Sequence, residues 1–180
     1  SAPVGLVTAV DYNDDYPSDH TILERTDRNA THQWKEMASI SSMSADDGVE
    51  VLGHEIYIAG YGSSSRGVSK YSPETNQWEA LPSTLTSRVA ASSAVLDGKL
   101  YLLGGGVDGN VYSSVEFYDP STNQWTYGPS LPEGIRRAEA ITLDGVIYVI
   151  GGIASNGFNH TKVYACMDGA WQEKTSMNNK

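Results

Sequence analysis

Four tryptophans recur along the 180-residue chain at nearly constant spacing. They are Trp34, Trp78, Trp125 and Trp171, which are 44, 47 and 46 residues apart. A tyrosine lies seven residues before three of them, at Tyr71, Tyr118 and Tyr164. The segments "KYSPETNQW" and "EFYDPSTNQW" are near copies, and "HEIYIAGYG", "GKLYLLGGG" and "GVIYVIGG" keep the same period. Markers that stay in phase over most of a chain indicate a structural unit used several times.

Each period contains short β-like segments. In one period these are residues 89–96, 100–103, 115–118 and 124–127, separated by Asp-Gly, triple-glycine and Asp-Pro-Ser-Thr-Asn turns. Four such strands predict a small antiparallel sheet. No segment of ten or more residues has a helical apolar period, so we expect almost no helix.

The order of these markers resembles the kelch repeat: an arginine before the first strand, glycines after the second, then tyrosine and tryptophan. The resemblance implies an all-β fold, a β-propeller built of four-stranded antiparallel blades. We expect an incomplete, degraded blade at 1–40 and blades at 41–83, 84–132 and 133–177. Kelch propellers usually have six or seven blades, so we expect part of a larger propeller rather than a closed four-bladed ring. The other blades would come from another chain, a longer parent chain or self-association.

Composition excludes some partners. The chain has a net charge of −10, which makes binding to nucleic acid or to an anionic membrane surface unfavourable. No apolar run is long enough to span a bilayer. The single cysteine, Cys166, excludes an intrachain disulfide and fits a cytoplasmic location, whereas glycosylation sequons at Asn29 and Asn159 fit an extracellular one.

Alternating strand direction places the loops between second and third strands, and the connections from one blade to the next, on the same face. These are also the segments that differ most between repeats, and four of the six arginines fall in them. Guanidinium groups and exposed aromatic rings are typical of protein-binding surfaces. The predicted partner-binding residues are Ser64, Tyr61, Arg66, Arg88, Tyr112, Arg136, Arg137, Asn156 and Phe158.

Several of these residues have a structural alternative. The kelch pattern itself includes an arginine before the first strand, so Arg88, Arg136 and Arg137 would then brace the blades. The repeated tryptophans and tyrosines are expected to form the core between blades. The histidines are scattered without a metal-ligand pattern, so we expect no metal, no cofactor and no catalytic residue.

The resulting hypothesis is a non-catalytic module that binds a protein or peptide, acidic partners included, through the variable loops. The kelch resemblance implies substrate recognition for a cullin-type ubiquitin ligase or actin-associated scaffolding. The alternatives are a kelch-like lyase, epimerase or oxidase that uses the propeller funnel, and a secreted glycosylated binding protein. An enzyme would need polar clusters on the first strands, where the sequence offers little beyond Ser92, Ser93 and Glu139.

Overall fold

The structure is a computed structural model that describes residues 6–8, 22–25, 34–41, 43, 47–62 and 64–177. The described residues contain β-strands and turns and no helix, so no helix there is long and apolar enough to cross a membrane. Three four-stranded antiparallel sheets follow one another along the chain, in the strand orders β4-β5-β6-β7, β8-β9-β12-β13 and β15-β16-β18-β19. We call them the first, second and third blade.

The strands of the blades match the repeat. The first blade consists of β4 (Gly48–Leu52), β5 (Glu55–Tyr61), β6 (Gly67–Ser72) and β7 (Gln77–Ala80). The second consists of β8 (Ser92–Leu96), β9 (Lys99–Leu103), β12 (Val115–Asp119) and β13 (Gln124–Gly128). The third consists of β15 (Glu139–Leu143), β16 (Val146–Ile150), β18 (Val163–Met167) and β19 (Ala170–Lys174).

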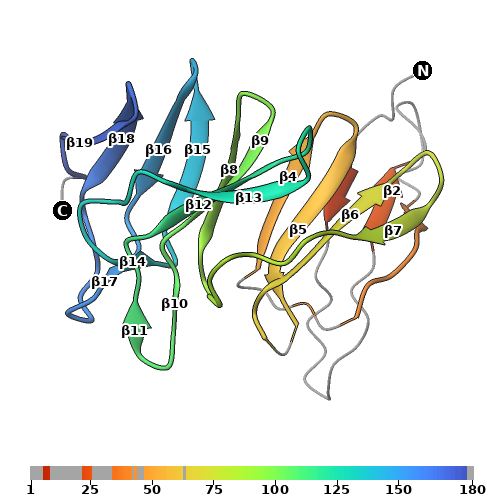
Figure 1. The fold of residues 1–180 in the computed structure, drawn as a ribbon, viewed down its shortest axis with the longest axis horizontal. Helices are drawn as coiled ribbons and strands as arrows, with labels where there is room; N and C mark the ends of the chain where they lie inside the picture. Colours follow the sequence, from red (N-terminus) through yellow and green to blue (C-terminus); the bar gives the residue numbers. More distant parts are fainter. Residues whose placement is uncertain are drawn as a thin grey trace.

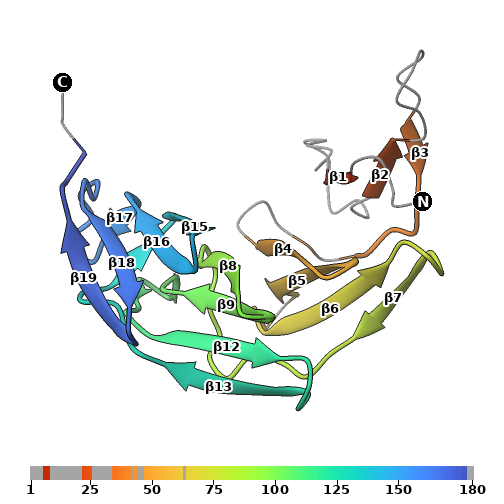
Figure 2. The same ribbon diagram turned by 90° about the horizontal axis from the view of Figure 1, so that it is seen from above.

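Strands β1 (Leu6–Thr8), β2 (Ile22–Arg25) and β3 (Trp34–Glu36) form a three-stranded antiparallel sheet before the first blade. The four sheets stand side by side along an arc, with β4, β8 and β15 on its concave side and β7, β13 and β19 on its convex side (Figures 1 and 2). The arc is open. The predicted all-β fold of four-stranded propeller blades is therefore confirmed, and the sheets do not close into a four-bladed ring.

Two-residue turns join the first and second strands of the later blades. Asp97 and Gly98 have φ values of 50° and 70°, and Asp144 and Gly145 have values of 50° and 75°. Positive φ at both central residues gives the turn the twist that an antiparallel hairpin needs. These turns lie at the end of the blades opposite β10, β11, β14 and β17 (Figure 1).

The first strand of the second blade starts later than the sequence predicts, at Ser92 rather than Val89. Ala90 has a φ of 55°, which breaks the extended conformation, and Val89 instead pairs with Gly106. A left-handed residue thus separates the strand from the connection that leads into it.

Apolar cores lie between neighbouring blades. Leu100, Leu102 and Tyr118 of the second blade pack on Tyr57 and Val68 of the first. On its other side, the second blade contributes Ala94, Leu103 and Val115 to a core with Ile147 and Val149 of the third. Burial of these faces stabilises the row of blades by about 25 cal/mol per Å² of apolar surface removed from water.

Trp78, Trp125 and Trp171 also bond to the preceding repeat. The indole Nε1 of Trp125 donates to the Pro82 carbonyl at 2.9 Å, and that of Trp171 donates to the Pro129 carbonyl at 2.8 Å. Trp78 donates to the Ala38 carbonyl at 2.9 Å. The ring packs while its N–H is satisfied across the blade boundary.

The three tyrosines of the repeat are not equivalent. Tyr71 and Tyr118 each donate to the side-chain oxygen of an asparagine with positive φ in the following turn, Asn76 and Asn123. Tyr71 and Tyr118 pair directly with Trp78 and Trp125 across the strands, whereas Trp171 pairs with Cys166. The turn between the third and fourth strands is shorter in the third blade. Because Tyr164 keeps its seven-residue spacing from Trp171, it lies two residues before Cys166, which takes the place opposite the tryptophan.

Candidate functional site

Hydrogen bonds join the predicted loops into one surface. The loops between second and third strands (residues 62–66, 104–114 and 151–162) and the blade connections (residues 81–91 and 129–138) form what we call the loop face. The backbone of Thr84 donates to the Arg66 carbonyl at 3.1 Å, and Arg88 donates to the Ser65 carbonyl at 3.2 Å. In the next repeat, Ile135 donates to the Tyr112 carbonyl at 3.1 Å. Each connection is therefore fixed to the loop of the preceding blade.

The same connections also bond to the blade that they enter. Val89 and Gly106 exchange backbone hydrogen bonds of 2.9 and 3.0 Å. The equivalent contact in the third blade is the pair of strands β14 (Ile135–Arg136) and β17 (Ile153–Ala154). The strands β10 (Gly106–Val107) and β11 (Asn110–Val111) form a hairpin at the same end of the molecule (Figure 1). The loop face is thus a continuous rim of ordered backbone.

Arg88 is part of the scaffold and not of the surface. Its side chain and that of Glu116 are both 0% exposed and form an ion pair of 2.8 Å. Arg88 also donates to the carbonyls of Gly104 and Ser114, at 2.7 and 2.9 Å. A side chain enclosed in this way cannot contact a partner, so the partner-binding expectation for Arg88 is corrected to the structural alternative.

The Arg88–Glu116 pair holds the blade connection onto the second blade. The second carboxylate oxygen of Glu116 accepts a hydrogen bond of 2.6 Å from the backbone of Leu85. Burial lowers the pKa of Arg88, and the Glu116 carboxylate opposes this effect. Removal of either partner would leave a buried charge uncompensated. The pair therefore keeps the blade connection in place on the second blade.

Arg136 and Arg137 do not repeat the position of Arg88. Ile135 is 1% exposed. Its backbone donates to Tyr112 in the loop of the second blade and pairs with Ala154 in the loop of the third blade. Arg137 has a φ of 54°, as Ala90 has in the second blade, and its backbone donates to the Ala90 carbonyl at 2.9 Å. Ile135 therefore occupies the position in the third blade that Arg88 occupies in the second. Arg136 and Arg137 are the next two residues, and both are exposed.

Four predicted residues lie on the part of the loop face that belongs to the third blade and the loop beside it. Arg136 pairs with Ile153 at the base of the loop that carries Asn156 and Phe158. The Asn156 side chain accepts from the Phe158 backbone at 3.0 Å, and the Phe158 side chain is 73% exposed. Tyr112, on the neighbouring loop, is half-buried and bonds through its backbone to Ile135. We call Tyr112, Arg136, Asn156 and Phe158 the Phe158 patch.

The other predicted residues lie around the first blade. Arg66 is half-buried and its Nε donates to the Thr84 carbonyl at 2.7 Å. Ser64 is exposed, and its carbonyl accepts from the Ser87 hydroxyl at 2.6 Å. The Tyr61 hydroxyl is 2.6 Å from the Ser69 hydroxyl. These contacts mainly hold the loop in place.

Glu133 ties the connection into the third blade to that blade. Its Oε1 lies 2.6 Å from the Tyr164 hydroxyl and 3.1 Å from both His160 Nε2 and Lys162 Nζ. Hydrogen bonds from Tyr164 and His160, followed by Lys162, lower the pKa of Glu133 to about 2. The Glu133 carboxylate therefore stays charged at neutral pH. Spacing alone did not reveal Glu133, because its partners lie 27 to 31 residues away.

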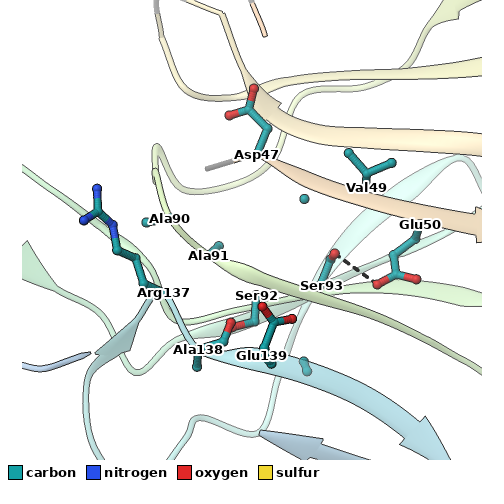
Figure 3. A pocket seen from close by; sticks show the side chains of 12 residues that line it. Asp47, Val49, Glu50, Ala90, Ala91, Ser92, Ser93, Arg137, Ala138 and Glu139 are labelled. Atoms are coloured by element: carbon teal, nitrogen blue, oxygen red, sulfur yellow. Dashed lines mark hydrogen bonds between the residues drawn. The ribbon is translucent and has the colours of Figure 1, made fainter. Parts of the chain in front are cut away.

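A hollow of about 410 Å³ lies on the concave side, where the first strands of the three blades meet. Its polar lining is formed by Asp47, Glu50, Ser92, Ser93, Arg137 and Glu139 (Figure 3). Ser93 donates to Glu50 at 3.1 Å, and burial raises the pKa of Glu50. Arg137 thus lines the hollow and is separated in role from the Phe158 patch.

The first strands therefore carry more polar groups than the sequence indicated. Sequence analysis identified Ser92, Ser93 and Glu139 but not Asp47, Glu50 or the contribution of Arg137. Their grouping depends on three strands from different repeats. Among the described residues, no three His, Cys, Asp or Glu side chains are placed to hold a metal ion.

Comparison with known proteins supports the architecture. The kelch motif matches residues 87–132, which contain the whole second blade. The second blade thus matches a kelch motif. A solved structure, "Structure of YjhT", matches with a TM-score of 0.72 at 18% identity, over 91% of this chain and 61% of that chain. No curated protein matches this sequence significantly.

The kelch resemblance is therefore confirmed, and the likeness to YjhT shows the fold. The present chain spans about three fifths of the length of the YjhT chain. Kelch repeats generally mediate protein–protein binding, so the motif and the fold suggest an interaction module.

Proposed function

We propose that this chain is a non-catalytic module that binds a protein or peptide through the Phe158 patch. The observation that carries the proposal is the exposed Phe158 side chain, which is held on an ordered loop that is paired to Arg136. Aromatic and arginine side chains on one surface are frequent in binding hot spots. Because β17, at the base of the Phe158 loop, is paired with β14, the patch would lose little conformational entropy on binding.

The partner class that we propose is a peptide with an acidic residue next to an apolar one. Arg136 would pair with the carboxylate and Phe158 would cover the apolar side chain. The kelch resemblance implies substrate recognition for a cullin-type ubiquitin ligase or actin-associated scaffolding, and both roles require binding of a protein. Either role fits a module of this kind.

The test compares acidic, neutral and basic peptides on an array probed with the chain and two variants. Arg136→Ala with Phe158→Ala should weaken binding of the selected acidic peptides by about 1–3 kcal/mol. His54→Ala with Glu74→Ala changes exposed residues outside the loop face and should leave binding intact. Selection of basic peptides, or equal loss in both variants, would refute the proposal.

A second candidate function is favoured by the hollow on the concave side. Glu50 has a raised pKa and lies with Ser93, Glu139 and Arg137 around a space large enough for a small molecule. A carboxyl group with a raised pKa can act in acid–base chemistry, as a kelch-like lyase or epimerase would require. Thermal-shift screening of sugars and small organic acids tests this candidate. A ligand that stabilises the chain but not its Glu50→Gln variant would favour it over the binding module.

A further inference from the structure

The loop that carries Phe158 contains a tight hairpin turn. The backbone N–H of Gly157 donates to the Ala154 carbonyl at 2.9 Å, and that of Ala154 donates to the Phe158 carbonyl at 3.0 Å. Gly157 has a φ of 81°, whereas Ser155 and Asn156 are not among the residues with positive φ. These features define a type I turn followed by a left-handed residue, a position that glycine fills without strain. The turn therefore places an asparagine directly before a glycine.

An asparagine that precedes a glycine can lose its side-chain amide in water. The backbone nitrogen of Gly157 can attack Cγ of Asn156, because glycine has no side chain that obstructs the approach. The new bond joins this nitrogen to Cγ, the bond from Cγ to Nδ2 breaks, and Nδ2 leaves as ammonia with the proton that Gly157 gives up. Water then opens the five-membered imide and leaves aspartate or isoaspartate at position 156. The reaction needs no oxidant and no cofactor.

The sequence makes this position singular and supplies internal references. Asn156 is the one asparagine of the chain that a glycine follows. Asn76 and Asn123 are each followed by glutamine, and their side-chain oxygens accept from Tyr71 and Tyr118. Amide loss should therefore be fastest at Asn156 wherever the backbone is free to move.

The folded turn holds Asn156 and Gly157 in an unreactive arrangement. The N–H of Gly157 is bonded to the Ala154 carbonyl, so this nitrogen cannot lose its proton and turn toward Cγ. The Asn156 side-chain oxygen accepts from the Phe158 backbone at 3.0 Å, which directs the amide toward residue 158. Residues 155–159 are exposed, whereas the pairing of β14 with β17 holds the base of the loop. The tip can therefore open locally without unfolding of the blade.

We propose that Asn156 is a deamidation site whose rate is set by opening of this turn, and that deamidation weakens binding of acidic peptides by the Phe158 patch. The second part rests on the proposed function. Aspartate at position 156 keeps an acceptor for the Phe158 N–H but adds a negative charge to a patch whose Arg136 would bind a carboxylate. Isoaspartate lengthens the main chain by one carbon, so the hydrogen bonds of the turn no longer match and Phe158 is displaced.

Peptide mapping by mass spectrometry measures amide loss at each asparagine of the full chain. The chain is incubated in mildly alkaline buffer, with and without denaturing urea. Asn156 should lose its amide before Asn76 and Asn123 in both solvents. Its loss should be about tenfold slower in the folded chain than in urea, because opening of the turn breaks two hydrogen bonds.

A variant that stiffens the turn tests the role of opening. Ser155 occupies the second position of the type I turn, where proline is favoured, and its N–H takes no part in the two bonds of the turn. Ser155→Pro should therefore slow amide loss at Asn156 in the folded chain. The rate in urea should stay nearly unchanged, because the turn is absent there.

The effect on binding is measured with the acidic peptides that the array selects. Asn156→Asp should bind them about tenfold more weakly, within the range found for single residues at binding hot spots. Gln172→Glu makes the same change from amide to carboxylate at an exposed site on β19, outside the loop face, and should leave binding intact.

Equal rates of amide loss at Asn156 in buffer and in urea would overturn the proposal, as would faster loss at Asn76 or Asn123. Undiminished binding of acidic peptides by Asn156→Asp would overturn the effect on the patch. A chain that binds no acidic peptide would refute the proposed function and this effect together, whereas the mapping decides separately whether Asn156 is the site.

Discussion

At the scale of single residues, burial separates side chains that the sequence treats alike. Arg88, Arg136 and Arg137 all precede a first strand, yet Arg88 is enclosed with Glu116 while Arg136 and Arg137 are exposed. Their roles differ because one residue of register decides which side chain enters the blade. The identity of the buried partner also matters, since Glu116 lies on the third strand of the blade and is remote from Arg88 in sequence.

Loss of either member of the buried pair should destabilise the fold. We expect Arg88→Ala to lower the free energy of unfolding by about 3–5 kcal/mol, because Glu116 would stay buried without its counter-charge. Denaturant unfolding measures this change, with Arg136→Ala as the exposed control. The paired change Arg88→Met with Glu116→Leu should cost less than Arg88→Ala. A loss below about 1 kcal/mol for Arg88→Ala, within the range of exposed ion pairs, would contradict the buried role.

Glu133 should give stability a dependence on acid pH. Its pKa in the folded chain is about 2, below the ordinary value of 4.5, so the unfolded chain binds a proton first. The stabilisation is complete above pH 4.5 and is lost as the pH falls from 4.5 toward 2. Thermal unfolding of Glu133→Gln and the unaltered chain should therefore differ more at pH 6 than at pH 2.5. An equal difference at both pH values would show that the carboxylate charge contributes nothing.

At the scale of elements, turns and strand pairs were predictable because their signals are local. The Asp-Gly turns and the strands at 100–103 and 115–118 follow from turn residues and apolar runs. One prediction was wrong and one feature was not predicted, and both have their origin in backbone conformation. Positive φ at Ala90 shortens a strand, and a shorter turn in the third blade places Cys166, not Tyr164, opposite Trp171. Positive φ at Ala90 has no composition signal, since alanine seldom adopts it. The shorter turn is marked by Asp168 and Gly169, but the unchanged spacing of Tyr164 from Trp171 conceals its effect on the strand pairing.

The hydrogen bond from Trp125 to the first blade should contribute to the free energy of unfolding. Trp125→Phe keeps an aromatic ring between the blades but removes the N–H that bonds to the Pro82 carbonyl. We expect a loss of about 1–3 kcal/mol in unfolding free energy, from the hydrogen bond and the smaller ring. Hydrogen exchange should speed up most at the boundary between the first and second blades. Uniform acceleration across all three blades would show that the contact is not local.

At the scale of the whole molecule, the period predicted the blades and the alternation of strands predicted the loop face. The hollow on the concave side could not be predicted in the same way. Glu50, Ser93 and Glu139 belong to three repeats, and only the curvature of the arc brings their strands together. The Phe158 patch could be predicted in part. Its residues were identified from the sequence, but the pairing of Arg136 with Ile153 is seen only in the structure.

The central claim is that loops and blade connections share one face. Its most direct test is a cysteine pair at Ser64 and Ser87, in a Cys166→Ala background, because the Ser87 hydroxyl donates to the Ser64 carbonyl at 2.6 Å. We expect mild oxidation to form an intramolecular disulfide at these positions, identified by peptide mapping, since the two backbones are close. The pair Ser64→Cys with Glu74→Cys, which joins the loop face to a turn outside it, should remain reduced. Cross-linking of the second pair in place of the first would contradict the arrangement of the blades.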